Sequence, residues 1–144
     1  MKILDIVKHR YPFVMIDKVI ESKYMESVVA TKNVSYNEPW GVGHYPEKPI
    51  FPGVLMIEAM GQASGFLFVD NNKNAVEKNL FGQLAKVERV KFIKPVFPGD
   101  VITIKVKLEN MINNYVIVSA KCYVEDEKVA KGKLSYVLKE VTYE

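Results

Sequence analysis

One segment of the chain is apolar on nearly every side of a helix and carries a single charged residue, Glu58, before Asp70 ends it. The segment runs from Val54 to Asn71, directly after Pro52 and Gly53. A helix of this kind has no face that favours water, so other parts of the protein must enclose it. Any fold for this chain therefore has to supply a cover for this helix.

A lipid bilayer is one possible cover, because residues 50–69 are about as many as a helix needs to cross a membrane. Against this, Pro52 and Gly53 interrupt the start of such a span. Glu58 and Gln62 would also be costly inside lipid. A sheet that wraps around the helix explains the pattern better.

Segments typical of strands lie on both sides of this helix. Residues 13–20 and 27–34 are rich in Val and Ile with polar residues between them, which predicts two strands in a hairpin. After the helix, three segments place apolar side chains on one face, and they span residues 101–108, 115–124 and 129–138. Turn sequences flank them at 97–100, 113–114 and 125–128.

The remaining segments complete the order of elements. Residues 3–7 show near-helical apolar spacing, which predicts a short helix of about two turns. Residues 71–79 are expected to be a polar connection, followed by about four antiparallel strands in all. A single enclosed helix needs a sheet that curls around it, so we expect an α+β fold with a curved antiparallel sheet wrapped around one long central helix. The 144 residues fit one domain over residues 1–144.

Composition narrows the functional classes. Cys122 is the only cysteine, and its strand-like surroundings predict a small buried side chain in a reducing compartment. The net charge of +3 is spread along the chain and does not favour nucleic-acid binding. Residues 1–12 carry early charges and lack a long apolar run, which argues against a secretory signal and predicts a cytoplasmic protein. With two histidines and no clustered carboxylates, no metal site is expected.

The loop before the long helix holds the most unusual chemistry of the chain. Residues 37–53 contain four prolines and three glycines, a density that predicts an irregular segment held in one path. His44 lies in this loop between Gly43 and Tyr45. A histidine held at a fixed angle is a ready base at neutral pH. The alternative is a loop histidine that only hydrogen-bonds its own backbone.

Glu58 is the second candidate. An ionised, unpaired carboxylate in an apolar helix would carry a large desolvation cost, so Glu58 either has a partner or holds a proton as a general acid would. The helix itself contains no basic residue that could pair with it. A purely structural buried pair is the alternative to a catalytic role.

Two further residues near Glu58 could contact a ligand. Gly53 stands where the first N–H groups of the helix have no intrahelical partner, so it could present a donor to a thioester carbonyl. A plain turn before a helix is the alternative. Gln62 lies four residues after Glu58 on the same face, where it could orient the carboxyl group or be a satisfied core amide. Val54, next to Gly53, is a further candidate for substrate contact.

Three stretches of the chain resemble a known family: HRYPFVMIDKV at 9–19, NEPWGVGHYPEKPIFPGVLMIEAMGQASG at 37–65 and VKFIKPVFPGD at 90–100. They are similar to the 3-hydroxyacyl-[acyl-carrier-protein] dehydratases of the bacterial type II fatty-acid pathway, in the single-domain branch with Glu on the helix. The resemblance covers nearly the whole chain in matching order. Its most specific part is the string Gly-His-x-Pro-x-x-Pro-x-x-Pro-Gly, followed by a helix with a Glu.

This resemblance implies a hot-dog fold and a homodimer in which His44 of one subunit meets Glu58 of the other. Such enzymes commonly assemble as hexamers, as trimers of dimers. In the family, the histidine matching His44 removes a proton from the thioester α-carbon, and the glutamate matching Glu58 helps the 3-hydroxyl leave as water. The amide at the Gly53 position binds the carbonyl. The implied reaction converts (3R)-hydroxyacyl-[acyl-carrier-protein] to the trans-2-enoyl product without a metal or redox cofactor.

The implied partner is acyl carrier protein with its phosphopantetheine-linked acyl chain. Four basic residues could dock this acidic partner or form a solvated strand face, and they are Lys86, Arg89, Lys91 and Lys94. The chain departs from common family sequences at residues 40–42 and 81–83, which leaves the chain-length preference open. The dehydratase/isomerase branch usually has Asp at the Glu58 position, which argues against isomerisation.

Two other activities fit parts of this pattern. A hot-dog thioesterase would use its carboxylate to activate water for hydrolysis, whereas a paired His44 and Glu58 favour elimination. A non-catalytic acyl-ligand sensor would need a DNA-binding unit, and only about a dozen residues precede the first predicted strand, too few for a helix-turn-helix.

Overall fold

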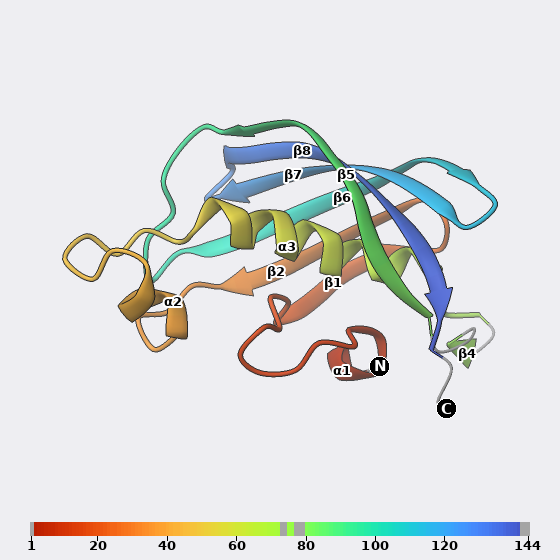
Figure 1. Ribbon diagram of the computed structural model, residues 1–144, viewed down its shortest axis with the longest axis horizontal. Coiled ribbons are helices and arrows are strands. Elements are labelled where there is room, and N and C mark those ends of the chain that lie inside the picture. Colours follow the sequence, from red (N-terminus) through yellow and green to blue (C-terminus); the bar gives the residue numbers. More distant parts are fainter. Residues whose placement is uncertain (1, 73–74, 77–79, 142–144) are drawn as a thin grey trace.

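The computed structural model describes residues 2–72, 75–76 and 80–141, in which one curved sheet wraps around a central helix (Figure 1). The helix is α3 (Gly53–Ser64). The strands of the sheet are β1 (Lys18–Lys23), β2 (Ser27–Asn33), β5 (Leu80–Phe92), β6 (Val101–Ile112), β7 (Tyr115–Val124) and β8 (Glu127–Glu140). Their order is β1-β2-β6-β7-β8-β5, and every neighbouring pair is antiparallel. The predicted α+β hot-dog fold is confirmed.

The smaller elements lie at the margins of this sheet. Helix α1 (Ile3–Ile6) has four residues and is therefore shorter than the two turns expected. A 3-10 helix, η1 (Gly65–Phe68), continues α3, and β3 (Val69–Asp70) pairs with β4 (Ala75–Val76). The expected polar connection therefore contains a short strand, while residues 73–74 and 77–79 of that connection lie outside the described part.

The alternating apolar side chains of the strands form the core, as the sequence predicted. In β7, the side chains of Val116, Val118, Ala120 and Cys122 are all buried. Burial raises the pKa of the Cys122 thiol to about 12, so this thiol stays protonated at neutral pH and is no ready nucleophile. The interpretation of Cys122 as a small buried side chain is confirmed.

Helix α3 is buried on one side and only partly covered on the other. Met56, Ala59, Met60 and Ala63 recur at helical spacing and are buried, and the helix packs on β2, β6 and β7. On the other side, the Val54 side chain is 71% exposed. The single chain therefore leaves part of this apolar helix without the enclosure that its sequence requires.

Several boundaries differ from the sequence prediction. Helix α3 ends at Ser64, although the apolar run continues to residue 69, and β8 begins at Glu127, inside the turn expected at 125–128. The first strand begins at Lys18 and not at residue 13, because the backbone of Met15 bonds to a side chain of α3 and not to another strand. The loop at 37–53 contains a short helix, α2 (Pro39–Gly43). Pro39 is tolerated there because the first turn of a helix needs no N–H from it.

Among the described residues, no helix combines the length and the apolar character that crossing a membrane requires.

Candidate active site

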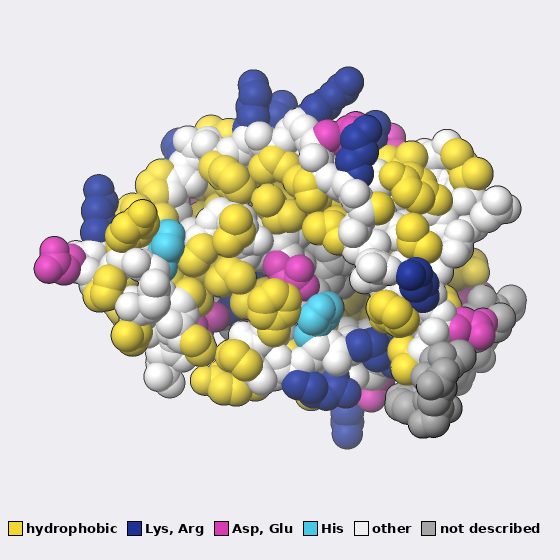
Figure 2. All heavy atoms as spheres, in the orientation of Figure 1, with side chains coloured by type: hydrophobic (Ala, Val, Ile, Leu, Met, Phe, Trp, Pro, Cys, Tyr) yellow, Lys and Arg dark blue, Asp and Glu magenta, His cyan; other side chains and the backbone are white. Residues whose placement is uncertain are grey.

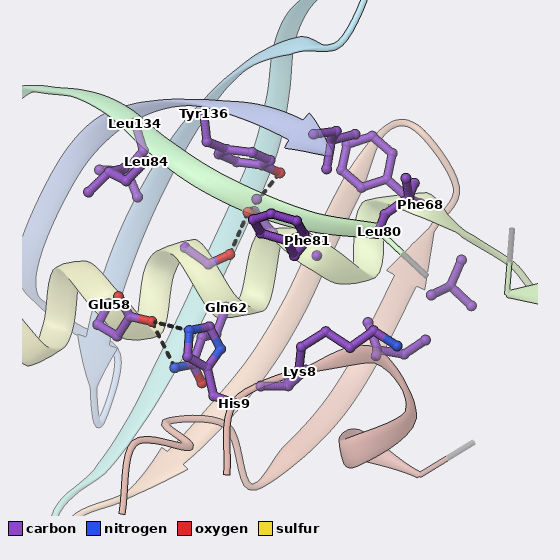
Figure 3. A pocket seen from close by; sticks show the side chains of 18 of the residues that line it. Lys8, His9, Glu58, Gln62, Phe68, Leu80, Phe81, Leu84, Leu134 and Tyr136 are labelled. Atoms are coloured by element: carbon purple, nitrogen blue, oxygen red, sulfur yellow. Dashed lines mark hydrogen bonds and ion pairs between the residues drawn. The ribbon is translucent and has the colours of Figure 1, made fainter. Parts of the chain in front are cut away.

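A pocket with a volume of about 430 Å³ lies between α3, the strands β5 and β8, and the segment that follows α1 (Figure 3). Along α3 and η1 its lining runs from Ile57 to Phe68, and Leu134 and Tyr136 of β8 form the opposite wall. Figure 3 shows Glu58 at one end of this row and Phe68 toward the other. The pocket is thus lined mainly by apolar side chains and has Glu58 at one end, and the charged residues Asp5 and Lys8 also line it.

Glu58 is held by two nitrogen-bearing side chains. Its Oε1 accepts a hydrogen bond of 2.9 Å from Nε2 of Gln62. The same oxygen lies 3.3 Å from Nε2 of His9. The sequence predicted that Glu58 either has a partner or holds a proton, and the structure shows partners. One of them, His9, was not among the residues predicted for the site. The signal was present, since His9 opens the first of the three family-like stretches.

Gln62 joins α3 to the segment before β1. Its Nε2 donates to the carbonyl of Phe13 over 2.8 Å, and its Oε1 accepts from the N–H of Met15 over 2.7 Å. Both interpretations of Gln62 hold, because it is a satisfied core amide that also orients Glu58. One buried side chain thus fixes the carboxylate and the strand-like segment beside it.

We expect Gln62→Ala to lower the free energy of unfolding by about 2 to 4 kcal/mol, because the substitution leaves the N–H of Met15 and the carbonyl of Phe13 without their partner. Urea unfolding of the variant and of the wild type measures this difference. Gln83→Ala is the matched control, since Gln83 is exposed on β5. Equal losses in the two variants would contradict this role of Gln62.

His44 caps the end of α2 and is exposed. Its Nδ1 lies 2.9 Å from the carbonyl oxygen of Ile50. A carbonyl only accepts, so Nδ1 carries a hydrogen in this bond. The structure therefore contains the backbone hydrogen bond that was the alternative to a catalytic role for His44, and the role of His44 as a base stays a prediction.

The single chain does not bring the two candidate residues together. Among the described residues that line the pocket, Glu58 is present and His44 is not. Figure 2 shows the two histidines of the chain apart on this face, one of them beside an acidic side chain. A base at His44 and an acid at Glu58 would need a second chain to meet.

Gly53 is the first residue of α3. A Cβ added there would lie 2.8 Å from Cζ of Phe92, so a side chain at this position would have to displace the Phe92 ring, which is 51% exposed. Neither Gly53 nor Val54 is among the described residues that line the pocket. Their proposed contacts with substrate stay predictions.

Strand β5 forms one edge of the sheet and carries exposed apolar side chains. Leu84 is 53% exposed, and Val87 is 40% exposed. Leu84 pairs with Tyr136 of β8, and Val87 pairs with Leu134. Side chains of paired residues point to the same face of a sheet, and the β8 partners face the pocket. Both β5 residues therefore lie on the α3 side of the sheet. Strand β5 therefore combines an open strand edge with exposed apolar side chains on the α3 side, and an open edge can pair with another chain.

The four basic residues considered for docking differ in their surroundings. Lys86 pairs with Glu88 over 2.9 Å, and Lys94 pairs with Glu127. Arg89 lies at an irregularity of β5 with a φ of 53°, and both Arg89 and Lys91 are exposed.

Comparisons with known proteins agree with this geometry. A family model described as a FabA-like domain matches residues 7–133. The 3-hydroxyacyl-[acyl-carrier-protein] dehydratase FabZ of Clostridioides difficile is 37% identical over 96% of this chain and 96% of its own length. The bifunctional enzyme LpxC/FabZ of Chlorobaculum tepidum is 42% identical over 92% of this chain, which spans 28% of that longer protein.

A solved structure supports the fold. The dehydratase heterocomplex ApeI:P from Xenorhabdus doucetiae matches with a TM-score of 0.82 and 17% identity, over 97% of this chain and 92% of the other. At that identity the likeness concerns the fold alone. From the family model and the full-length relatives together, the chain belongs to the FabA-like family and, within it, to the 3-hydroxyacyl-[acyl-carrier-protein] dehydratases of the FabZ type.

Proposed function

We propose that this protein dehydrates (3R)-hydroxyacyl-[acyl-carrier-protein] to the trans-2-enoyl form during fatty-acid elongation, with His44 as base and Glu58 as acid. The observation that carries the proposal is the carboxylate of Glu58 at the end of an apolar pocket that can take an acyl chain. Full-length relatives with the same named activity support it. A cytoplasmic location stays a prediction.

The proposed chemistry is an elimination that needs one base and one acid. Nε2 of His44 takes a proton from C2 of the acyl chain, and the C3–O bond breaks. The departing hydroxyl takes a proton from Glu58 and leaves as water, while the double bond forms between C2 and C3. A proton then passes from the imidazolium back to the carboxylate, which restores both groups. The N–H of Gly53 would bind the thioester carbonyl, where negative charge develops.

The catalytic pair is proposed to form across a homodimer. The partly covered side of α3 and the apolar edge of β5 lie next to the pocket, so a second copy would cover both at once. The same second copy would supply His44, which its own chain keeps away from Glu58. A closed two-fold dimer of this kind contains two such sites. A hexamer built from three dimers stays a prediction.

The acyl chain is proposed to run along α3, away from Glu58 and toward Phe68. The apolar side chains that line both walls of that space favour a neutral acyl chain over a charged substrate. The carrier protein would present its phosphopantetheine arm from outside, where Arg89 and Lys91 are exposed.

Incubation of the purified protein with a 3-hydroxyacyl thioester of the carrier protein tests this proposal. The expected product is the trans-2-enoyl thioester, with no release of free thiol. Free thiol without the enoyl product would instead indicate thioester hydrolysis and would overturn the proposal.

A further inference from the structure

The segment that follows α1 brings the second histidine of the chain onto the carboxylate of Glu58. His9 reaches the pocket from the segment that follows α1 and lies beside α3, as Figure 3 shows. Its Nε2 lies 3.3 Å from Oε1 of Glu58, and its ring packs on Phe13 with 5.6 Å between the ring centroids. This arrangement holds the imidazole beside the carboxylate.

Two nitrogen groups converge on the same oxygen of Glu58. Gln62 donates to Oε1 over 2.9 Å, and His9 approaches that oxygen as well. Within the described part of the chain, both nitrogen contacts fall on Oε1 and neither falls on Oε2. Oε1 is therefore the restrained oxygen of the carboxyl group, and Oε2 is the oxygen left for the substrate.

We propose that His9 is a positioning residue for the reaction: its Nε2 contacts Oε1 of Glu58 and so holds the carboxyl group with Oε2 toward the leaving hydroxyl. The inference rests on the proposed dehydration. His9 acts through Glu58 and takes no proton from the substrate. Loss of the donor leaves Gln62 as the sole partner of Oε1 and lets the carboxyl group rotate.

The segment that carries His9 is also held by contacts that do not involve Glu58. These contacts make it possible to test the role of His9 separately from the stability of the segment. Nη1 of Arg10 donates to the carbonyls of Val7 and His9, so the guanidinium holds the backbone of the segment. Gln62 holds the same segment at Phe13 and Met15. Arg10 has no contact with Glu58, and Arg10→Ala therefore loosens the segment without removing the donor.

The test compares steady-state kinetics of the wild type, His9→Ala, His9→Gln and Arg10→Ala on the carrier-protein substrate. His9→Ala is expected to lower kcat by about 10- to 100-fold, since a misplaced catalytic group costs up to that much. KM should change by less than about twofold, because no substrate contact is lost. His9→Gln retains an N–H donor and should recover most of the rate. Arg10→Ala should keep kcat near the wild-type value.

A double-mutant cycle gives the second readout. In the Glu58→Gln background, His9→Ala should cause no further loss, because two residues that act as one unit are not additive. An unchanged kcat in His9→Ala, an equal loss in Arg10→Ala, or an additive loss in the double variant would overturn the role of His9. A wild type that fails to dehydrate would instead refute the proposed function itself.

Discussion

Glu58→Gln is expected to reduce the dehydration rate by about 100- to 10,000-fold, the range for the loss of a general acid. Glutamine keeps the size of the side chain and can still bond to Gln62, but it cannot give a proton to the leaving hydroxyl. Rapid measurement of enoyl product on the carrier-protein substrate checks the loss.

The folded structure of this variant should be retained. Its urea midpoint should lie close to that of the wild type, because the side chain of Glu58 is 27% exposed and the amide fills the same space. Glu47→Gln is the matched control, since Glu47 is exposed on the loop that carries His44. A Glu58→Gln protein that dehydrates at the wild-type rate would remove Glu58 from the mechanism.

Val87→Lys is expected to separate the dimer and to abolish most of the activity with it. Val87 lies on the edge strand β5 and is 40% exposed in the single chain, so a charge there would be buried against the second copy without a partner. The monomer would retain His44 and Glu58 but hold them apart. We expect the rate to fall by about 100-fold or more, since both acid and base catalysis are lost together.

Light scattering and the dehydration assay, run on the same sample, check this expectation. Ile112→Lys is the control, because Ile112 is 58% exposed at the end of β6, next to the turn at Asn113. It should leave both the molar mass and the rate unchanged. Full activity in a Val87→Lys protein shown to be a monomer would contradict the shared site.

The sheet and the central helix could be predicted because their apolar patterns are regular. The alternation in residues 115–124 gave β7 with its final bounds, and the apolar run after Pro52 gave α3. The sequence pattern also required a covered helix, and the exposed Val54 shows that one chain does not complete the cover.

The errors have a common physical origin. The segment at 13–17 has the composition of a strand, but Gln62 bonds to its backbone, so tertiary contacts override the local pattern. Likewise, Pro39 ends a helix in most positions and begins one here. Local patterns carry no information about which distant side chain satisfies a backbone group.

His9 was missed for a related reason. Periodicity and spacing relate Glu58 to residues on its own helix. The pairing with a histidine far away in the chain arises only when the segment before β1 folds against α3. Gln62 was found because four residues separate it from Glu58 on the same face. The part of the site within one helix was predictable, and the part that crosses elements was not.

Complementation between two inactive variants tests the shared site most directly. His44→Ala and Glu58→Gln are produced in one cell with different tags, so that mixed dimers form and can be purified. In a mixed dimer, one site unites the intact His44 of one subunit with the intact Glu58 of the other. Mixed dimers are expected to recover about half of the wild-type rate, because one of their two sites is complete. Mixed dimers that remain as inactive as either parent would contradict it.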